Sequence, residues 1–289
     1  MAIMIDRLTP SIGAEITGVN LNDPLSDQDR NDLLKAFLDH HVLFFRDQYL
    51  APQRHLEIAR LFGEIDSHPY NRTLGNGLEG VQIVENNGEW VKRDGQFYTA
   101  AWHSDTTFLP HPYKGALLTA QVIPDVGGDT LWSNLAAAYD MLPEKIQHLI
   151  EGMEARHSYP VIATTDTSPI EHFKGVIHPV VRVHPETGRK SLLVNENFTR
   201  EILGLSPSAS QSLLTLLMEP IRSPETQVRF RWTAGSLAIW DNRCTAHYAS
   251  LDYTQRRVMH RVTLVGDKPI TTREWDDRLA RSEREMMTA

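Results

Sequence analysis

After residue 100 the chain consists mainly of short apolar or alternating segments separated by turn residues, and this pattern limits the possible folds more than any other feature. Segments of this kind are typical of β-strands. Strands are predicted at 116–123, 153–159, 176–183, 192–195, 228–232 and 236–240. They do not alternate regularly with helices, which argues against a doubly wound parallel sheet. Many short strands with few helices favour a sandwich or a jelly-roll barrel, which is a mainly β (α+β) fold with flanking helices.

The helical segments are marked by caps, stops and charge patterns. They are predicted after Ser26 and over 52–62, 134–151 (with a break at Leu142-Pro143), 207–219 and 271–287. Ser26 and Ser206 are residues that cap helix N-termini well, and Gly63 stops the second helix. The segment 271–287 is dense in Arg and Glu, so we expect a solvated helix or a frayed tail.

The first hundred residues contain fewer strand signals. Residues 42–45 form an uninterrupted apolar run, which indicates a buried strand. The region 66–101 is rich in Gly and Asn and is expected to be loops around one strand at 81–84. No linker divides the chain, so we predict a single domain over residues 1–289.

Charge and cysteine content narrow the possible functions. The chain has 29 Lys and Arg against 37 Asp and Glu, which gives a net charge of −8. Binding to nucleic acid or to a membrane surface normally needs a basic field, so this charge argues against both functions. One Cys excludes a disulfide framework, a Cys-rich zinc site and an iron–sulfur cluster. With 13 His, any metal site should use imidazole and carboxylate ligands. No targeting or membrane-spanning segment is visible, so we expect a cytoplasmic protein.

The strongest local motif is Trp102-His103-Ser104-Asp105. Side chains two residues apart on an extended segment point to the same side, so His103 and Asp105 could reach one cation. His247 is the natural third ligand. Two His and one carboxylate on one face of a metal suit non-heme Fe(II), because the other positions stay open for a co-substrate and O2. An isolated His-x-Asp is a weak signal, and a surface turn capped by Asp105 is the alternative.

A second candidate lies at Arg257, Met259 and Arg261, which share one face if the segment is a strand. Two buried Arg side chains need an anion, since isolated buried charge is costly. Arg is also suited to two-point recognition of a carboxylate. The alternative is a pair of surface Arg residues that balance nearby acids.

Ordered motifs along most of the chain resemble the Fe(II)/2-oxoglutarate-dependent dioxygenases typified by taurine dioxygenase and the aryloxyalkanoate dioxygenases. The matching motifs lie at 12–19, 102–108, 127–132, 178–185, 194–199, 239–243, 256–261 and 266–269. They look most similar to the taurine and alkylsulfatase branch. The resemblance implies a double-stranded β-helix (jelly-roll, cupin-like) core and an enzyme that converts 2-oxoglutarate and O2 to succinate and CO2 while it hydroxylates a substrate.

The resemblance also implies roles for single residues. His103, Asp105 and His247 match the iron ligands. Arg257 and Thr130 match the residues that bind the distal carboxylate of 2-oxoglutarate. Arg261, His68 and Phe198 match residues of the substrate pocket, the first two at its anionic head group. Relatives are often dimers or tetramers, so a homodimer or homotetramer is expected.

The substrate is less defined than the chemistry. The stretch His157 to Ala163 and Thr99 depart from the taurine enzyme's pattern, whereas the head-group residues are retained. A small anionic substrate is therefore expected, either a sulfonate or an alkyl sulfate. The alternatives are the same chemistry on a carboxylate, such as an aryloxy acid or an amino-acid derivative, and a non-catalytic cupin-like binding protein.

Most of the remaining histidines need no function. Surface or loop positions are expected for His40, His41, His55, His111, His148 and His172. His178 and His184 are expected to be structural, and Cys244 to be a small buried residue.

Overall fold

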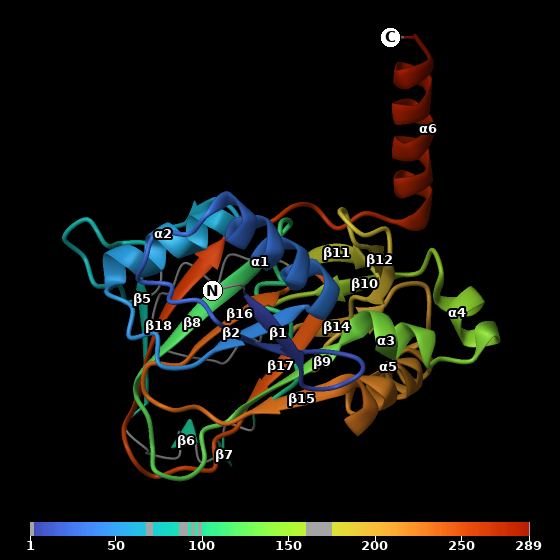
Figure 1. The fold of residues 1–289 in the computed structure, drawn as a ribbon. Coiled ribbons are helices and arrows are strands. Elements are labelled where there is room, and N and C mark those ends of the chain that lie inside the picture. The colour runs from blue at the N-terminus through green and yellow to red at the C-terminus, as the bar shows by residue number, and fades with distance from the viewer. Residues whose placement is uncertain are drawn as a thin grey trace.

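A large sheet forms the centre of the fold in a computed structural model (Figure 1) that describes residues 3–67, 72–86, 92–93, 96–97, 100–159 and 175–288. Its strands follow the order β1 (Met4–Arg7), β2 (Ala14–Thr17), β3 (Val42–Phe45), β16 (Leu237–Asp241), β8 (Gly115–Val122), β18 (Arg257–Leu264) and β4 (Ile65–Asp66). An eighth strand, β5 (Gln82–Asn86), also pairs with β18. All pairs are antiparallel except β2–β3.

A second sheet faces the first and consists of β15 (Gln227–Phe230), β9 (Thr130–Asn134) and β17 (Thr245–Ala249). Side chains of both sheets meet in one apolar cluster, in which Phe44 stacks on Phe230 and lies against the edge of Trp132. Smaller sheets are formed by β10 (Glu154–His157) with β11 (Val176–Pro179) and β14 (Thr199–Ile202), by β12 (Val181–Val183) with β13 (Lys190–Leu192), and by β6 (Lys92–Arg93) with β7 (Gln96–Phe97). The mainly β fold is confirmed as facing sheets without a closed barrel.

Strand β3 shows why an unbroken apolar run forms a strand here. All four of its residues are buried. Leu43 and Phe45 pack in the cluster under the first two helices, whereas Val42 and Phe44 pack in the cluster between the sheets. Because successive side chains of a strand point to opposite faces, a strand covered on both sides needs apolar residues at every position.

Helices cover the sheets on both outer sides (Figure 1). Helices α1 (Asp27–His40) and α2 (Pro52–Phe62) pack on the large sheet, and α3 (Leu135–Asp140), α4 (Glu144–Ile150) and α5 (Pro207–Ile221) gather beside the smaller sheets. A 3₁₀ turn, η2, covers Pro224–Thr226. The C-terminal helix α6 (Thr272–Thr288) begins against the rest of the chain, where the Thr272 hydroxyl donates to Glu151, and then projects away from it.

Local signals placed the helices well. Ser26 caps α1 in a reciprocal capping box with Asp29, and Ser206 caps α5. The helix predicted over 134–151 is two helices, since the chain breaks at Leu142-Pro143 as expected. Among the described residues, no helix is long and apolar enough to cross a membrane.

Two strand predictions need correction. The segment 176–183 is split into β11 and β12 at Val180, whose N–H bonds to the carbonyl of Met153. The strand predicted at 192–195 ends at Leu192, because Asn195 begins a turn. The Asn195 side chain accepts from the N–H of Phe198, and the backbone N–H of Asn195 donates to the Thr199 hydroxyl.

Two histidines expected at the surface are buried. His41 and His55 are 6% and 1% exposed. His55 lies on the face of α2 that packs against β8 and β18, together with Ile58, Ala59 and Phe62. The expectation for these two side chains was therefore wrong.

Candidate metal centre

The proposed metal ligands come from two chain segments that are held together by backbone hydrogen bonds. His247 lies on β17, and His103 forms an isolated antiparallel bridge to it. The His103 N–H donates to the His247 carbonyl at 3.0 Å, and the His247 N–H donates to the His103 carbonyl at 2.7 Å. The Ser104 hydroxyl adds a bond to the Thr245 carbonyl at 2.8 Å. Residues 141 and 144 positions apart are thus paired as they would be in neighbouring strands, which fixes both imidazoles.

The three side chains form one cluster whose ligand atoms lie within 4.8 Å of one another. Nε2 of His103 is 3.9 Å from Asp105 Oδ1, and Nε2 of His247 is 3.8 Å from the same oxygen. Nδ1 of His103 donates to the carbonyl of Ala101 at 2.8 Å, which leaves Nε2 as the ligand atom. These three residues were selected from the sequence, and the structure brings them together.

Asp105 reaches this cluster in a way that the sequence reasoning did not anticipate. It lies in a turn rather than an extended segment, and Thr106 after it has a φ of 54°. The Asn242 side chain holds the turn, because its Oδ1 accepts from the Asp105 N–H at 2.7 Å and its Nδ2 donates to the Asp105 carbonyl at 3.0 Å. Nδ2 also donates to the carbonyl of Tyr113 at 2.9 Å. Asn242 was missed, although it lies in the quoted motif at 239–243.

The electrostatics of the cluster favour metal binding. Burial alone would raise the pKa of Asp105, but the charges of Arg261 and the two imidazoles outweigh it and lower the pKa to about 2. Burial, followed by the neighbouring His103, lowers the pKa of His247 to about 3. At neutral pH the carboxylate is therefore ionised and the His247 imidazole is neutral, which are the forms that bind a metal. Two imidazoles and one carboxylate fit Fe(II).

Arg257 and Arg261 lie on the same interior side of β18 as Met259, as predicted for a strand. Arg261 Nη2 is 2.6 Å from Asp105 Oδ2, and its guanidinium lies 5.9 Å from the ring centre of Trp240. Arg257 is 7% exposed, and its Nε is buried without a hydrogen-bond partner among the described residues. No carboxylate in the described part of the chain lies within ion-pair distance of Arg257. A buried guanidinium without a counter-ion is suited to bind an anion from solution.

Trp232 is a neighbour of both Thr130 and Arg257. Thr130 is the first residue of β9, and its Oγ1 accepts a hydrogen bond from Trp232 Nε1 at 3.0 Å. The Arg257 guanidinium is 6.0 Å from the ring centre of Trp232. Thr130 and Arg257, the two residues matched to 2-oxoglutarate binding, therefore share this indole as a neighbour. Trp232 was not selected from the sequence, since nothing near it in the chain marks it.

Phe198 lies next to the metal cluster, with its ring 5.9 Å from His103 in an edge-on arrangement. Phe108 and Tyr159, at 5.0 and 6.2 Å from Phe198, extend an aromatic surface that the sequence reasoning did not predict. His68 falls outside the described residues, as do Thr99 and the segment 160–174. The predicted substrate role of Phe198 thus has a geometric basis, and that of His68 stays a prediction.

A second cluster of possible ligands, His184, Asp241 and Cys244, has a structural explanation. Arg243 donates to both Asp241 oxygens, from Nε at 2.9 Å and from Nη2 at 2.6 Å. His184 Nε2 donates to Oδ2 at 3.0 Å, in agreement with its expected structural role. Because both oxygens of this carboxylate are already bound by a guanidinium, a cation has little to gain at this position.

Comparison with known proteins places this geometry in a family. The model of the taurine catabolism dioxygenase TauD, TfdA family matches residues 5–263. An alkylsulfatase from Acinetobacter baylyi is 37% identical over 282 residues, which cover 92% of this chain and 86% of the relative. An alpha-ketoglutarate-dependent sulfate ester dioxygenase from Pseudomonas putida is 38% identical over 290 residues, which cover 94% and 92%.

The fold agrees as well. The crystal structure of a taurine dioxygenase from Burkholderia xenovorans superimposes with a TM-score of 0.79 at 35% identity, covering 94% of this chain and 93% of the other. This match confirms the jelly-roll core expected from the sequence. With the family model covering most of the sequence, the chain belongs to the taurine catabolism dioxygenase TauD, TfdA family.

Proposed function

We propose that this protein is an Fe(II)- and 2-oxoglutarate-dependent dioxygenase that hydroxylates a small anionic substrate, a sulfonate or an alkyl sulfate. The observation that carries the proposal is the proximity of His103, Asp105 and His247, two of which have pKa values that favour metal binding. Iron would supply the activation of O2, coupled to the conversion of 2-oxoglutarate to succinate and CO2. The protein supplies the ligands, two cationic side chains and a partly aromatic surface.

Arg257 and Arg261 would each bind one of the two anions, 2-oxoglutarate and the substrate. Arg257 lies with Thr130, away from the ligand carboxylate, and is assigned to the distal carboxylate of 2-oxoglutarate. Arg261 lies at the ligand carboxylate itself, so an anion held by Arg261 would sit close to the metal. This is the position that a substrate needs if one of its C–H bonds is to react.

The substrate class is supported by the relatives. One is named an alkylsulfatase and another a sulfate ester dioxygenase. Hydroxylation of the carbon that carries the sulfur or sulfate oxygen replaces C–H by C–OH, after which the carbon–heteroatom bond breaks spontaneously. The product pair would be an aldehyde and the released sulfite or sulfate.

Two measurements test the function. Anaerobic addition of Fe(II) and 2-oxoglutarate should give a weak visible charge-transfer band. Succinate release should then depend on a sulfonate or sulfate ester within a panel that also contains aryloxy acids and amino-acid derivatives. Absence of both the band and succinate would refute the enzyme, whereas succinate release with carboxylates alone would change only the substrate class.

Assembly and location belong to the same proposal. We propose a homodimer or homotetramer, which light scattering of the purified full chain can test. Cytoplasmic localisation is likewise proposed and can be tested by fractionation of cells.

A further inference from the structure

The hydrogen bond between Trp232 and Thr130 joins two buried side chains that lie 102 residues apart in the chain. Both are 3% exposed. Thr130 opens β9 at its pairing with Phe230 of β15, and Trp232 follows two residues after that partner. The register of these two strands therefore brings the indole to the hydroxyl.

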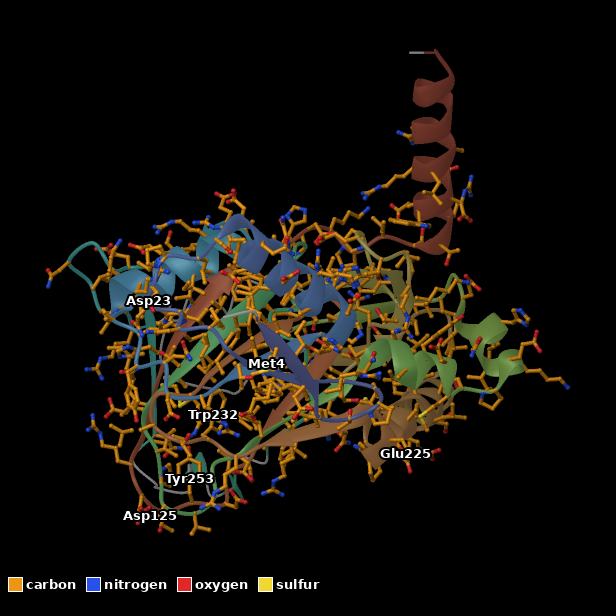
Figure 2. The ribbon with its side chains drawn as sticks, viewed as in Figure 1. Met4, Asp23, Asp125, Glu225, Trp232 and Tyr253 are labelled. Atoms are coloured by element: carbon orange, nitrogen blue, oxygen red, sulfur yellow. The ribbon has the colours of Figure 1, made fainter. Side chains whose placement is uncertain are left out.

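The same indole faces the cation of this region. The Arg257 guanidinium lies 6.0 Å from the Trp232 ring centre, and Phe230 supports the ring edge-on at 5.0 Å. Arg257 also lies against the chain at Gly128, where a side chain would approach Arg257 Cδ to 3.2 Å and the Tyr253 ring to 3.2 Å. Figure 2 shows Trp232 and Tyr253 toward the same end of the molecule. Arg257 is thus enclosed by aromatic side chains and backbone.

The direction of the hydrogen bond is fixed by chemistry. An indole N–H can only donate, whereas a hydroxyl can both donate and accept. Trp232 therefore occupies an acceptor site of Thr130 Oγ1 and leaves the hydroxyl hydrogen available. No acceptor for that hydrogen is found within the described residues, and Arg257 Nε is also a buried donor without a partner there. The two donors share the Trp232 indole as a neighbour, and two such donors suit one carboxylate.

We propose that Trp232 is a positioning residue for 2-oxoglutarate. Its indole N–H orients the Thr130 hydroxyl so that it donates to the distal carboxylate held by Arg257. Trp232 makes no contact with the reacting atoms, so its contribution is to the binding of the co-substrate. The inference rests on the proposed function, because it assumes that this carboxylate binds at Thr130 and Arg257.

A neighbouring residue separates this role from simple packing. Trp132 belongs to the same aromatic cluster, with its ring centre 6.3 Å from that of Trp232, and it is fully buried. Its indole N–H has no acceptor among the residues that the structure describes. Trp132→Phe and Trp232→Phe therefore remove similar apolar volume from one cluster, but only the second removes a hydrogen bond.

The test is the dissociation constant of 2-oxoglutarate, measured by anaerobic calorimetry on the Mn(II)-loaded full-length protein. W232F should raise it roughly two- to tenfold, the effect of one ordinary hydrogen bond. W132F should change it by less than W232F. In turnover assays W232F should raise KM for 2-oxoglutarate and leave kcat close to that of the wild type.

A double-mutant cycle identifies the path of the effect. Thr130→Val removes the hydroxyl while keeping the shape, so W232F should add little in that background. The proposal would be overturned if W132F and W232F weakened the binding of 2-oxoglutarate equally, or if W232F still weakened it in the Thr130→Val protein. If W232F does not fold, benzothienylalanine at position 232 replaces only the N–H by sulfur. The same increase in the dissociation constant of 2-oxoglutarate is then expected. Failure of the wild-type protein to bind 2-oxoglutarate would instead refute the proposed function.

Discussion

Arg261 forms an ion pair with Asp105, with Nη2 of the guanidinium 2.6 Å from Oδ2 of the carboxylate. Asp105 Oδ1 faces the two imidazoles, so its two oxygens have different neighbours. The pair keeps the carboxylate ionised in spite of its burial, as the lowered pKa of Asp105 shows. It also places a cation next to the metal centre, where an anionic substrate can share it.

Replacement of Arg261 by Ala should weaken the binding of the anionic substrate. Without its guanidinium the head group loses a charged partner in a largely buried site, so KM for the sulfonate or sulfate should rise by about tenfold or more, equivalent to about 1.4 kcal/mol. KM for 2-oxoglutarate should change much less. The measurement is succinate release at varied concentrations of each of the two compounds.

Arg257→Ala is the matched comparison for this prediction. It removes the same side chain from the same strand, but at the position beside Thr130 and Trp232. It should raise KM for 2-oxoglutarate more than KM for the substrate. The opposite pattern in the two variants would mean that the roles of the two arginines are exchanged.

Asn242→Ala should weaken metal binding although Asn242 is not a proposed ligand. Its amide holds the Asp105 backbone from both sides, at 2.7 and 3.0 Å. Loss of these bonds leaves the turn around Asp105 free to move, and outer partners of ligands typically contribute 10- to 100-fold to metal affinity. A rise of roughly this size in the dissociation constant of Mn(II), measured by calorimetry, is therefore expected.

Asn134→Ala is the control for the general cost of removing a buried amide. Asn134 is 1% exposed and also makes three hydrogen bonds, to the N–H groups of Ala136 and Ala137 and to the carbonyl of Ser11. Both variants should lower the melting temperature of the metal-free protein. Equal metal affinity in the two would show that Asn242 stabilises only the fold.

Local sequence signals were sufficient for the helices and for strand β3. Ser26 with Asp29, Gly63 and Ser206 mark helix ends through contacts within a few residues, so the sequence contains all the information needed. β3 was recognisable because a strand buried on both faces is continuously apolar. The proposed ligands and the two arginines could also be selected from the sequence, since their spacing and the family motifs mark them, and the structure brings the three proposed ligands together.

The missed features depend on contacts between distant parts of the chain. Asn242 and Asp105 are 137 residues apart, and Trp232 and Thr130 are 102 apart, so no local period relates either pair. The turn at Asp105 was misjudged because an alternating pattern over three residues cannot reveal the positive φ of Thr106. His55 is different, because it stands three, four and seven residues before Ile58, Ala59 and Phe62 on the buried face of α2 and could have been recognised by that spacing.

His55 should make the stability of the protein depend on pH. Burial, followed by the proximity of His260, lowers its pKa from 6.5 to about 3. Between these values only the unfolded state binds the proton, so stability is fully present above about pH 6.5 and is lost as the pH falls toward 3. Each pH unit in this window should cost about 1.4 kcal/mol of the free energy of unfolding for this one group.

The slope of unfolding free energy against pH isolates this contribution from changes in packing. Urea unfolding of the metal-free protein between pH 4.5 and 6, roughly the middle of the window, should give a slope that is shallower by about 1.4 kcal/mol per pH unit in His55→Gln than in the wild type. The comparison variant is His148→Gln, which makes the same replacement at an exposed histidine. If both substitutions shifted only the absolute free energy of unfolding, so that the plots against pH ran parallel to that of the wild type, the burial of His55 would not be the cause of the pH dependence.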